Sequence, residues 1–451
     1  MARADLTRGP IVRGIVAFAL PLLFTSVVQQ LYSTVDLLFV GNALGTQAAA
    51  ALGVGVMLIN MLVALFTGLS TGATVCVAQL FGGGDARQVA SGVSSSLAVG
   101  VVGGLALGAA TFAFAPAFLS AMEAPASVID DALAYLRVYS VAVVAVAVYN
   151  MAAGVSRALG DSSTPFFAQL AGGLMNVAAN WLILCVLQRG IGGVALATLA
   201  SNALAAGIAL QGIRKAVGPC ALRVANVQRE HVARIVSIGA PIALQSAVVT
   251  FSNVVVQHQI DLLGVQAIAA FSAYFKVELP IYYAVLALGQ ATTTFVAQNH
   301  GAHDHERACK GAWICQGLGL AVSAALSALL LGLGYWAFWI FNQDEAVIQC
   351  GISIIAVTFP FYFLYSILEV QADAIRGLGH SLPPALIVVA NIGILRLALV
   401  LALTAGGVSA ESIAAAYPIT WATTALCMAA YRVHIERVHH HRLAFPIRRA
   451  R

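Results

Sequence analysis

Five carboxylates stand inside long apolar stretches of this sequence, where acidic side chains are rare unless they do chemistry. A carboxylate at the centre of a bilayer costs at least about 2.5–3.5 kcal/mol on insertion scales, so each is a functional candidate by default. We place three basic residues in the same stretches, Arg137, Lys276 and Arg396. The excess of acids favours binding of cations over anions. The five acids are Asp36, Asp261, Glu278, Glu369 and Asp373.

Asp36 is the strongest of these candidates because it belongs to a polar stripe. Gln29, Tyr32 and Asp36 follow one another at steps of three and four residues, so all three point from one face of a helix. Such a stripe must face the interior of a bundle or water. We expect Gln29 and Tyr32 to line a substrate cavity, and a helix–helix hydrogen bond is the structural alternative for Asp36.

Further oxygen atoms suited to a cation lie later in the sequence. Asn176 and Asn180 are one helical turn apart, and Thr198 supplies a hydroxyl. One carboxylate, two amide carbonyls and one hydroxyl are hard oxygen ligands that suit Na⁺, and the carboxylate alone can carry H⁺. The residues therefore indicate a coupling site for Na⁺ or H⁺, and we expect no cofactor and no metal centre beside it.

The second half of the sequence offers a separate candidate site. Tyr274 and Glu278 are one turn apart, whereas Lys276 faces elsewhere on the same helix, and Pro280 predicts a local break. A structural pair in which Lys276 neutralises Glu278 is the alternative.

Glu369 and Asp373 are also one turn apart and would repel each other if both were ionised. Either one of them carries a proton or a cation lies between them. Asp261 is close enough to the end of its stretch to be solvated at the surface.

The composition identifies the environment in which these residues act. The chain is 60% hydrophobic and 9% charged, with a mean hydropathy of +0.90. Soluble domains carry about 25% charged residues, so this is an integral membrane protein. Twelve apolar stretches are each long enough to cross about 30 Å of hydrocarbon as a helix. They cover 14–40, 49–79, 90–118, 133–156, 164–187, 191–213, 236–262, 267–298, 309–341, 349–374, 383–404 and 412–433.

The fold class predicted is therefore an all-α membrane protein, because a barrel would show short alternating segments. Three phrases recur at a spacing of 219 residues, which indicates a duplication. A long internal repeat in so apolar a chain is typical of transporters whose halves rock around a central site. The paired phrases begin at Leu44 and Leu263, at Val77 and Val296, and at Arg157 and Arg376.

The basic residues predict the topology. Of 23 Lys and Arg, 19 fall on one side of the twelve-span arrangement, which makes both termini cytoplasmic. Arg157 and Arg376 are assigned to short loops on that side. The domains predicted are an N-terminal six-helix lobe (1–213), a basic cytoplasmic linker (214–235), a C-terminal six-helix lobe (236–433) and a cytoplasmic tail (434–451).

The two six-helix halves and the repeated Val-Ala-Gln-x-x-Gly and Arg-x-Leu-Gly-x-Ser-x-x-Pro phrases resemble the multidrug and toxic compound extrusion (MATE) family, over about residues 10–435. The resemblance implies two bundles in a V and export of organic, often cationic and amphipathic compounds as H⁺ or Na⁺ enters. The family's first-helix acid falls on Asp36, its fifth-helix pair on Asn176 and Asn180, and its sixth-helix threonine on Thr198. Many members have a second acid where Asn180 stands. Glu278 with Lys276 is similar to a pattern of one prokaryotic branch, and Asp373 stands where a small residue is commoner.

Two other classes of function compete with drug export. A flippase for lipid-linked saccharides would need a cavity rich in Arg and Lys. A membrane enzyme would need a paired-carboxylate, His-Glu-x-x-His or nucleophile-elbow motif, none of which the sequence contains, so we expect no enzyme. The expected partners are small molecules and the bilayer, without nucleic acid. The expected protein is a functional monomer in a bacterial cytoplasmic membrane.

Overall fold

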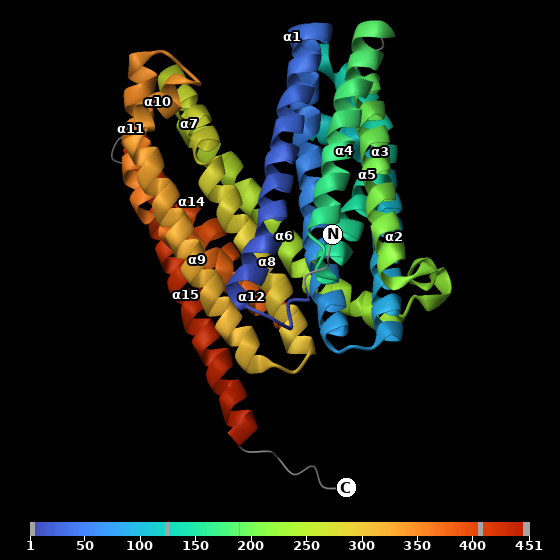
Figure 1. Ribbon diagram of the computed structural model, residues 1–451. Helices are drawn as coiled ribbons and strands as arrows, with labels where there is room; N and C mark the ends of the chain where they lie inside the picture. The colour runs from blue at the N-terminus through green and yellow to red at the C-terminus, as the bar shows by residue number, and fades with distance from the viewer. Residues whose placement is uncertain (1–4, 122–125, 189, 405–408, 445–451) are drawn as a thin grey trace. The chain divides into compact units, whose positions relative to one another are not determined.

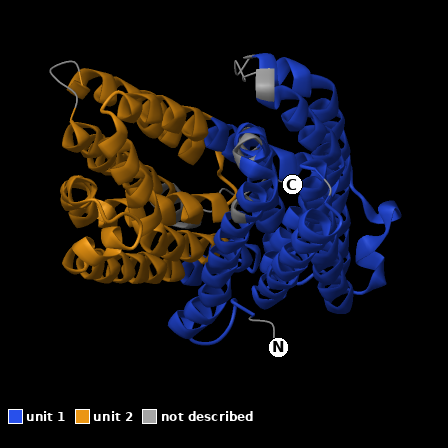
Figure 2. Cartoon of the chain, turned by 90° about the horizontal axis from the view of Figure 1, so that it is seen from above, with its two compact units in different colours: residues 1–247, 294–308 blue, residues 248–293, 309–451 orange. Residues whose placement is uncertain are grey.

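The computed structural model describes residues 5–121, 126–188, 190–404 and 409–444, and their regular structure is helical throughout. Within these ranges, twelve helices are long and apolar enough to cross a membrane, which confirms the predicted fold class. The chain divides into two compact units, which Figure 2 shows in different colours. Unit 1 comprises 1–247 and 294–308, and unit 2 comprises 248–293 and 309–451.

Unit 1 is built around α3, which contacts α1, α2 and α5. Its apolar core combines alanines with buried Val, Leu and Ile side chains and includes two tyrosines of α3. The helices are α1 (Ile11–Gly82), α2 (Ala86–Ala121), α3 (Ala126–Ala158), α4 (Ser163–Asn180), the π-helix η1 (Trp181–Val186), α5 (Gly192–Val217), the short 3₁₀ turns η2 (Pro219–Leu222) and η3 (Val224–Asn226), and the first part of α6 (Arg229–Asp261).

Unit 2 has an aromatic core in which α12 and α15 pack together. After the end of α6, its helices are α7 (Val265–Val277), α8 (Leu279–Gly301, whose end belongs to unit 1), α9 (His305–Gly332), α10 (Gly334–Trp339), α11 (Glu345–Thr358), the 3₁₀ turn η4 (Phe359–Phe361), α12 (Tyr362–Gly377), α13 (Leu382–Val388), the π-helix η5 (Val389–Leu395), α14 (Arg396–Thr404) and α15 (Ala410–Ala444).

Several predicted spans differ from the observed helices. The stretch 267–298 is two helices, because the chain bends at Glu278 between α7 and α8. The break falls two residues before Pro280, where the missing backbone N–H interrupts the helical ladder. Both flanks of the predicted linker 214–235 are helical, so only 218–228 lies between α5 and α6. The predicted lobe boundaries stay a prediction.

The duplication is visible in the backbone. Gly45 and Gly264, at the 219-residue spacing, have φ of 85° and 88° and extended ψ. This conformation favours glycine because a Cβ would be strained there. Gly45 divides α1 into two antiparallel spans, Ile11–Gly45 and Ala50–Gly82, as Figure 1 shows. The repeated Leu-Gly phrase therefore encodes a turn between consecutive helices.

The two copies of the Val-Ala-Gln-x-x-Gly phrase meet in unit 1, where the ends of α1 and α8 cross. A Cβ on Gly82 would contact the backbone carbonyl of Gln298 and lie 2.9 Å from Ala302 N. A Cβ on Gly301 would lie 2.7 Å from Gln79 Cα. Each glycine thus allows the backbone of the other copy to approach. The glycines of this phrase are explained by helix packing and not by a ligand.

Candidate functional site

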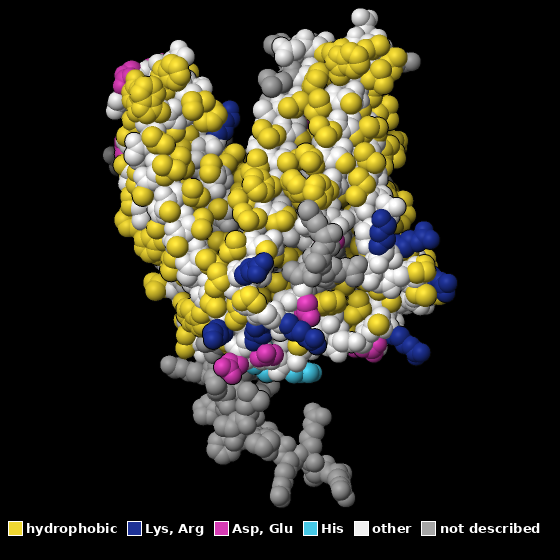
Figure 3. Space-filling view, viewed as in Figure 1, with side chains coloured by type: hydrophobic (Ala, Val, Ile, Leu, Met, Phe, Trp, Pro, Cys, Tyr) yellow, Lys and Arg dark blue, Asp and Glu magenta, His cyan; other side chains and the backbone are white. Residues whose placement is uncertain are grey.

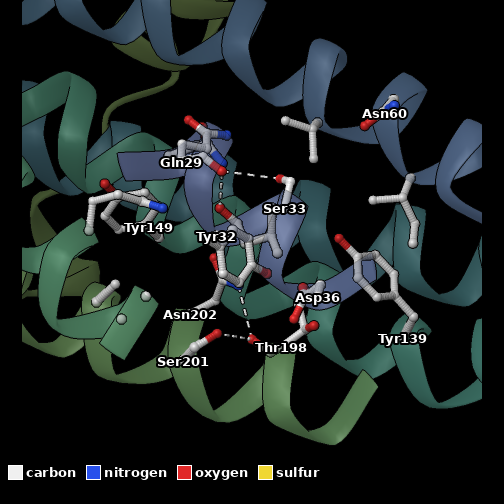
Figure 4. Close-up of a pocket in the computed structure, with 18 of the residues that line it drawn as sticks. Gln29, Tyr32, Ser33, Asp36, Asn60, Tyr139, Tyr149, Thr198, Ser201 and Asn202 are labelled. Carbon is white, nitrogen blue, oxygen red and sulfur yellow. Dashed lines mark hydrogen bonds between the residues drawn. The ribbon is translucent and has the colours of Figure 1, made fainter. Parts of the chain in front are cut away.

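A cavity of about 350 Å³ opens within unit 1 and is lined mostly by polar and aromatic side chains. Figure 4 shows its walls, which come from α1, α3, α4 and α5. Asp36 is the one charged residue among the described residues that line it. The polar lining residues are Gln29, Tyr32, Ser33, Asp36, Asn60, Tyr135, Tyr139, Tyr149, Asn150, Gln169, Thr198, Ser201 and Asn202.

The stripe expected on the first helix faces this cavity. Gln29, Tyr32 and Asp36 lie on the same side of α1 and point into the cavity (Figure 4). The Asp36 carboxylate accepts a hydrogen bond from Asn180 Nδ2, and the Tyr32 side chain lies close to the same carboxylate. Asp36 is half-buried, so it is open to the cavity on one side and held by α4 on the other.

Asn176 and Asn180 lie behind Asp36 and are fully buried. Asn180 Nδ2 also donates to Asn176 Oδ1 at 2.9 Å, which their spacing of one turn on α4 allows. Asn180 Oδ1 has no hydrogen-bond partner, and the Asn176 side chain also lies close to the Asp36 carboxylate. A buried polar atom without a partner costs about 1–3 kcal/mol, so Asn180 Oδ1 is an unsatisfied acceptor in the side chain that holds Asp36.

Thr198 lies on α5, close to the Tyr32 side chain and to Asp36 (Figure 4). Its hydroxyl donates to Val194 O at 3.0 Å, and its carbonyl accepts from Ser201 Oγ and Asn202 Nδ2, both at 2.9 Å. These bonds fix the three side chains along one face of α5. The structure therefore brings Asp36 and Thr198 to one cavity, with Asn180 hydrogen-bonded to Asp36 behind its wall, while their role in ion coupling stays a prediction.

Sequence reasoning missed the tyrosines that α3 contributes to the cavity. Tyr135 and Tyr139 on α3 are both buried, with tilted rings whose centroids lie 5.8 Å apart, and Tyr149 lines the cavity further along the same helix. The spacing of four between Tyr135 and Tyr139 could have signalled a shared face. Nothing in the sequence placed that face opposite Asp36.

Glu278 of unit 2 lies at the bend between α7 and α8. Its backbone N–H donates to Tyr274 O at 3.0 Å, and its carbonyl accepts from Ile281 N at 3.0 Å. Tyr274 is fully buried in an aromatic cluster, with its ring centroid 6.0 Å from that of Phe359. The bend therefore presents the Glu278 side chain at the edge of the aromatic core of unit 2.

Lys276 is exposed, and its Nζ lies 5.5 Å from the centroid of the Phe341 ring. This cation–π contact directs the ammonium toward Phe341, which fits the expectation that Lys276 faces elsewhere on the helix.

We expect Glu278→Gln to shift or abolish the pH or Na⁺ dependence of transport while expression and thermal stability stay at the wild-type level. The amide keeps the size of the side chain but cannot exchange a proton or balance a cation. Transport in vesicles at several pH values and Na⁺ concentrations measures this, with Glu306→Gln, exposed in the first turn of α9, as the matched control. A merely unstable mutant, together with rescue by a Lys276→Met, Glu278→Leu double mutant, would show a structural role instead.

Asp373 has a partner that the sequence analysis did not assign to it. Arg376 Nη1 lies 2.7 Å from Asp373 Oδ1, and both side chains are buried. The spacing of three residues on one helix could have revealed the pair. Glu369 is half-buried one turn earlier on α12. Arg376 therefore supplies a positive charge beside the two acids. The sequence analysis had considered only a proton on one acid or a cation bound between them.

The assignment of Arg157 and Arg376 to short loops was wrong, because they lie in the last turns of α3 and α12, and Arg376 is buried. Arg432, one of the 19 basic residues counted on the cytoplasmic side, is also buried, on α15. Its guanidinium donates to Gln371 Oε1 at 2.7 Å and lies 4.5 Å from the Trp313 ring centroid. The number of basic residues within spans was therefore underestimated. Asp261, by contrast, is exposed at the end of α6.

The comparison with known families decides what kind of protein carries this cavity. The pattern of the MatE family matches residues 21–182 and 241–428, which is most of the chain. The chain belongs to the MatE family. The resemblance stated from the repeated motifs is confirmed, and members of this family are transporters.

Bacterial relatives extend the similarity over most of the length. The probable multidrug resistance protein YpnP of Bacillus subtilis is 26% identical over 68% of this chain and 69% of its own. The probable multidrug resistance protein YoeA of the same organism is 23% identical over 83% of each chain. The multidrug export protein MepA of Staphylococcus aureus is 20% identical over 80% of each.

Solved structures share the fold. A structure reported as "Crystal structure of MATE in complex with MaL6" matches with a TM-score of 0.90 at 18% identity, over 97% of this chain and 99% of that one. Another, described as "Reverse polarity of binding pocket suggests different function of a MOP superfamily transporter from Pyrococcus furiosus", matches with a TM-score of 0.88 at 18% identity, over 97% and 98%. At such identities the likeness shows the fold alone.

Proposed function

We propose that this MatE protein is an antiporter that exports organic cations in exchange for H⁺ or Na⁺, with Asp36 as the coupling carboxylate. The observation that carries the proposal is the charge of the cavity in unit 1. Among its described lining residues Asp36 is the one acid, and none is Lys or Arg. An amphipathic cation can pair with this carboxylate and place its apolar part against the tyrosines.

The arrangement around Asp36 supports competition between the coupling ion and the cargo. The carboxylate, together with the unpartnered Asn180 Oδ1, offers two oxygen atoms to a small cation. A proton on the same carboxylate would remove its charge. Either event weakens binding of a cationic cargo at this site, which is the differential affinity that exchange requires. No cofactor enters this scheme.

A flippase for lipid-linked saccharides is the second candidate, and the buried arginines of unit 2 are what would favour it. Arg376 pairs with Asp373, and Arg432 with Gln371. Arg396 lies 4.5 Å from the Tyr417 ring centroid and donates to Thr420 Oγ1 at 3.3 Å. Each guanidinium thus already has protein partners, so the cation exporter remains the better proposal.

Efflux from inverted membrane vesicles tests the proposal directly. A fluorescent organic cation should move when either a pH gradient or a Na⁺ gradient is imposed, and the effective gradient identifies the ion. An amphipathic anion of similar size is the matched control and should not move. Anion transport with cations excluded would support the flippase and overturn the antiporter.

We further propose a bacterial cytoplasmic membrane, a monomer as the functional unit, and both termini on the cytoplasmic side. Cysteines introduced at Ser127 and Ser412 should then react with an impermeant maleimide in intact cells, and one at Ala225 should react only after permeabilisation. These variants need a background without native exposed thiols. Labelling of Ala225→Cys in intact cells would overturn the orientation.

A further inference from the structure

The linker between α5 and α6 is fastened along its length to the side of α2. Ser94 Oγ donates to Ala221 O at 2.9 Å, and Ser91 Oγ donates to Asn226 O at 2.8 Å. Gln228 N donates in turn to Ser95 Oγ at 3.1 Å. Because three hydrogen bonds hold it, the segment 218–228 presents a defined surface next to the helix.

The height of these contacts along α2 places the linker at the membrane interface. Ser91–Ser95 lie five to nine residues after Ala86, or about 8–14 Å from the start of α2 at 1.5 Å per residue. The span Ala86–Ser120 is 35 residues, about 52 Å long, whereas a bilayer with its headgroups is about 40–45 Å thick. A contact 8–14 Å above the helix start therefore lies at the level of the headgroups or just inside them.

The outward surface of the linker combines positive charge with exposed apolar side chains. Val224 is 85% exposed and Leu222 is 38% exposed, on either side of the exposed Arg223. Basic side chains gather beside hydrophobic ones on the right flank of Figure 3, where Figure 1 shows the linker. Glu230 is the one acid of residues 214–230, against the exposed cations Arg214, Lys215, Arg223 and Arg229.

We propose that this linker is an interfacial binding site for the headgroups of anionic lipids. Val224 and Leu222 enter the apolar edge of the leaflet, while the guanidinium and ammonium groups around them meet lipid phosphates. Basic residues that only set the membrane topology would need charge alone. This segment is also held in a fixed position and exposes apolar side chains at the level of the lipid headgroups.

Native mass spectrometry of the purified full chain with added phosphatidylglycerol or phosphatidylcholine tests the proposal. Wild type should retain phosphatidylglycerol preferentially. The triple variant Arg214→Gln, Lys215→Gln, Arg223→Gln should lose affinity for it by about fivefold for each charge removed, with no change for phosphatidylcholine. The matched control Arg8→Gln, Arg13→Gln, Arg87→Gln removes three exposed cations near the first turns of α1 and α2. It should keep the preference.

A second measurement reads the depth of the linker. A fluorophore on the exposed Cys220, with the other cysteines replaced by Ala, should be quenched more by nitroxide-labelled phosphatidylglycerol than by the labelled phosphatidylcholine. Equal quenching by both lipids, or an equal loss of binding in the test and control variants, would overturn the proposal. Full displacement of the lipid by inorganic phosphate would also overturn it, because that would show a site for a free anion.

Discussion

Asp36→Asn is expected to leave a folded, inserted protein in which ion-driven efflux has fallen by at least about tenfold, since coupling free energies of 1–3 kcal/mol correspond to factors of about 5–150. The amide can still accept the hydrogen bond from Asn180, so the wall of the cavity should keep its structure. It cannot carry a proton or balance a cation, so the coupling ion and the cargo no longer compete for this site. Efflux driven by pH and Na⁺ gradients in inverted vesicles measures the loss.

Two further variants make this result specific. Asp261→Asn removes an exposed carboxylate at the end of α6 and should transport like wild type. Asp36→Glu retains an ionisable group and should keep part of the coupling. Wild-type rates from Asp36→Asn would show that the coupling ion binds elsewhere, with Glu278 the next candidate.

Asp373→Ala is expected to lower the free energy of unfolding by about 3–5 kcal/mol, because it removes the carboxylate that is ion-paired with the buried Arg376 guanidinium. The duplication supplies a compensating change. At the 219-residue spacing, Asp373 and Gly289 correspond to Gly154 and Ser70. In unit 1, Ser70 Oγ accepts from Arg157 Nη2 at 3.2 Å, the equivalent of the Asp373–Arg376 contact.

The space beside the equivalent arginine is filled in both halves, but by a side chain from a different helix in each. In the N-terminal half Ser70 faces Gly154, and in the C-terminal half Asp373 faces Gly289. A Cβ on Gly154 would meet Ser70 Oγ, and a Cβ on Gly289 would meet Asp373 Oδ2. Also, Thr74 donates to Gly154 O at 3.0 Å and Thr293 to Asp373 O at 3.1 Å, so the backbones are equivalent.

The double variant Gly289→Ser, Asp373→Gly should therefore recover much of the lost stability, whereas Gly289→Ser alone should clash with the carboxylate. Denaturant or thermal unfolding of the purified variants in detergent measures these differences. A double variant as unstable as Asp373→Ala would contradict the equivalence of the two halves. A stable double variant with altered ion dependence would instead assign Asp373 to coupling.

The sequence predicted the features that depend on local pattern and composition. Continuous apolar stretches predicted twelve spans because each must satisfy its own backbone in lipid. The spacing of Gln29, Tyr32 and Asp36 predicted a common face, and the repeat predicted equivalent turns such as those at Gly45 and Gly264. These predictions succeed because helical periodicity and glycine conformation are properties of neighbouring residues.

The sequence did not predict which side chains of distant helices contact one another. Arg432 was counted with the tail because it follows the last apolar residues, yet α15 continues past it and buries it against Gln371 of α12. The tyrosines of α3 gave no sign that they face Asp36, since that depends on how α1 and α3 pack.

The sequence by itself determined the membrane class, the duplication and the face of α1 that carries Asp36, because insertion cost and helical periodicity act on each segment alone. Only the tertiary structure decided which groups meet that face. It placed Asn180 against Asp36, crossed the two copied glycines Gly82 and Gly301, and fastened the linker to α2. The physical reason is that packing is selected among many compact arrangements by close contacts between remote residues, and a single sequence does not state which residues those are.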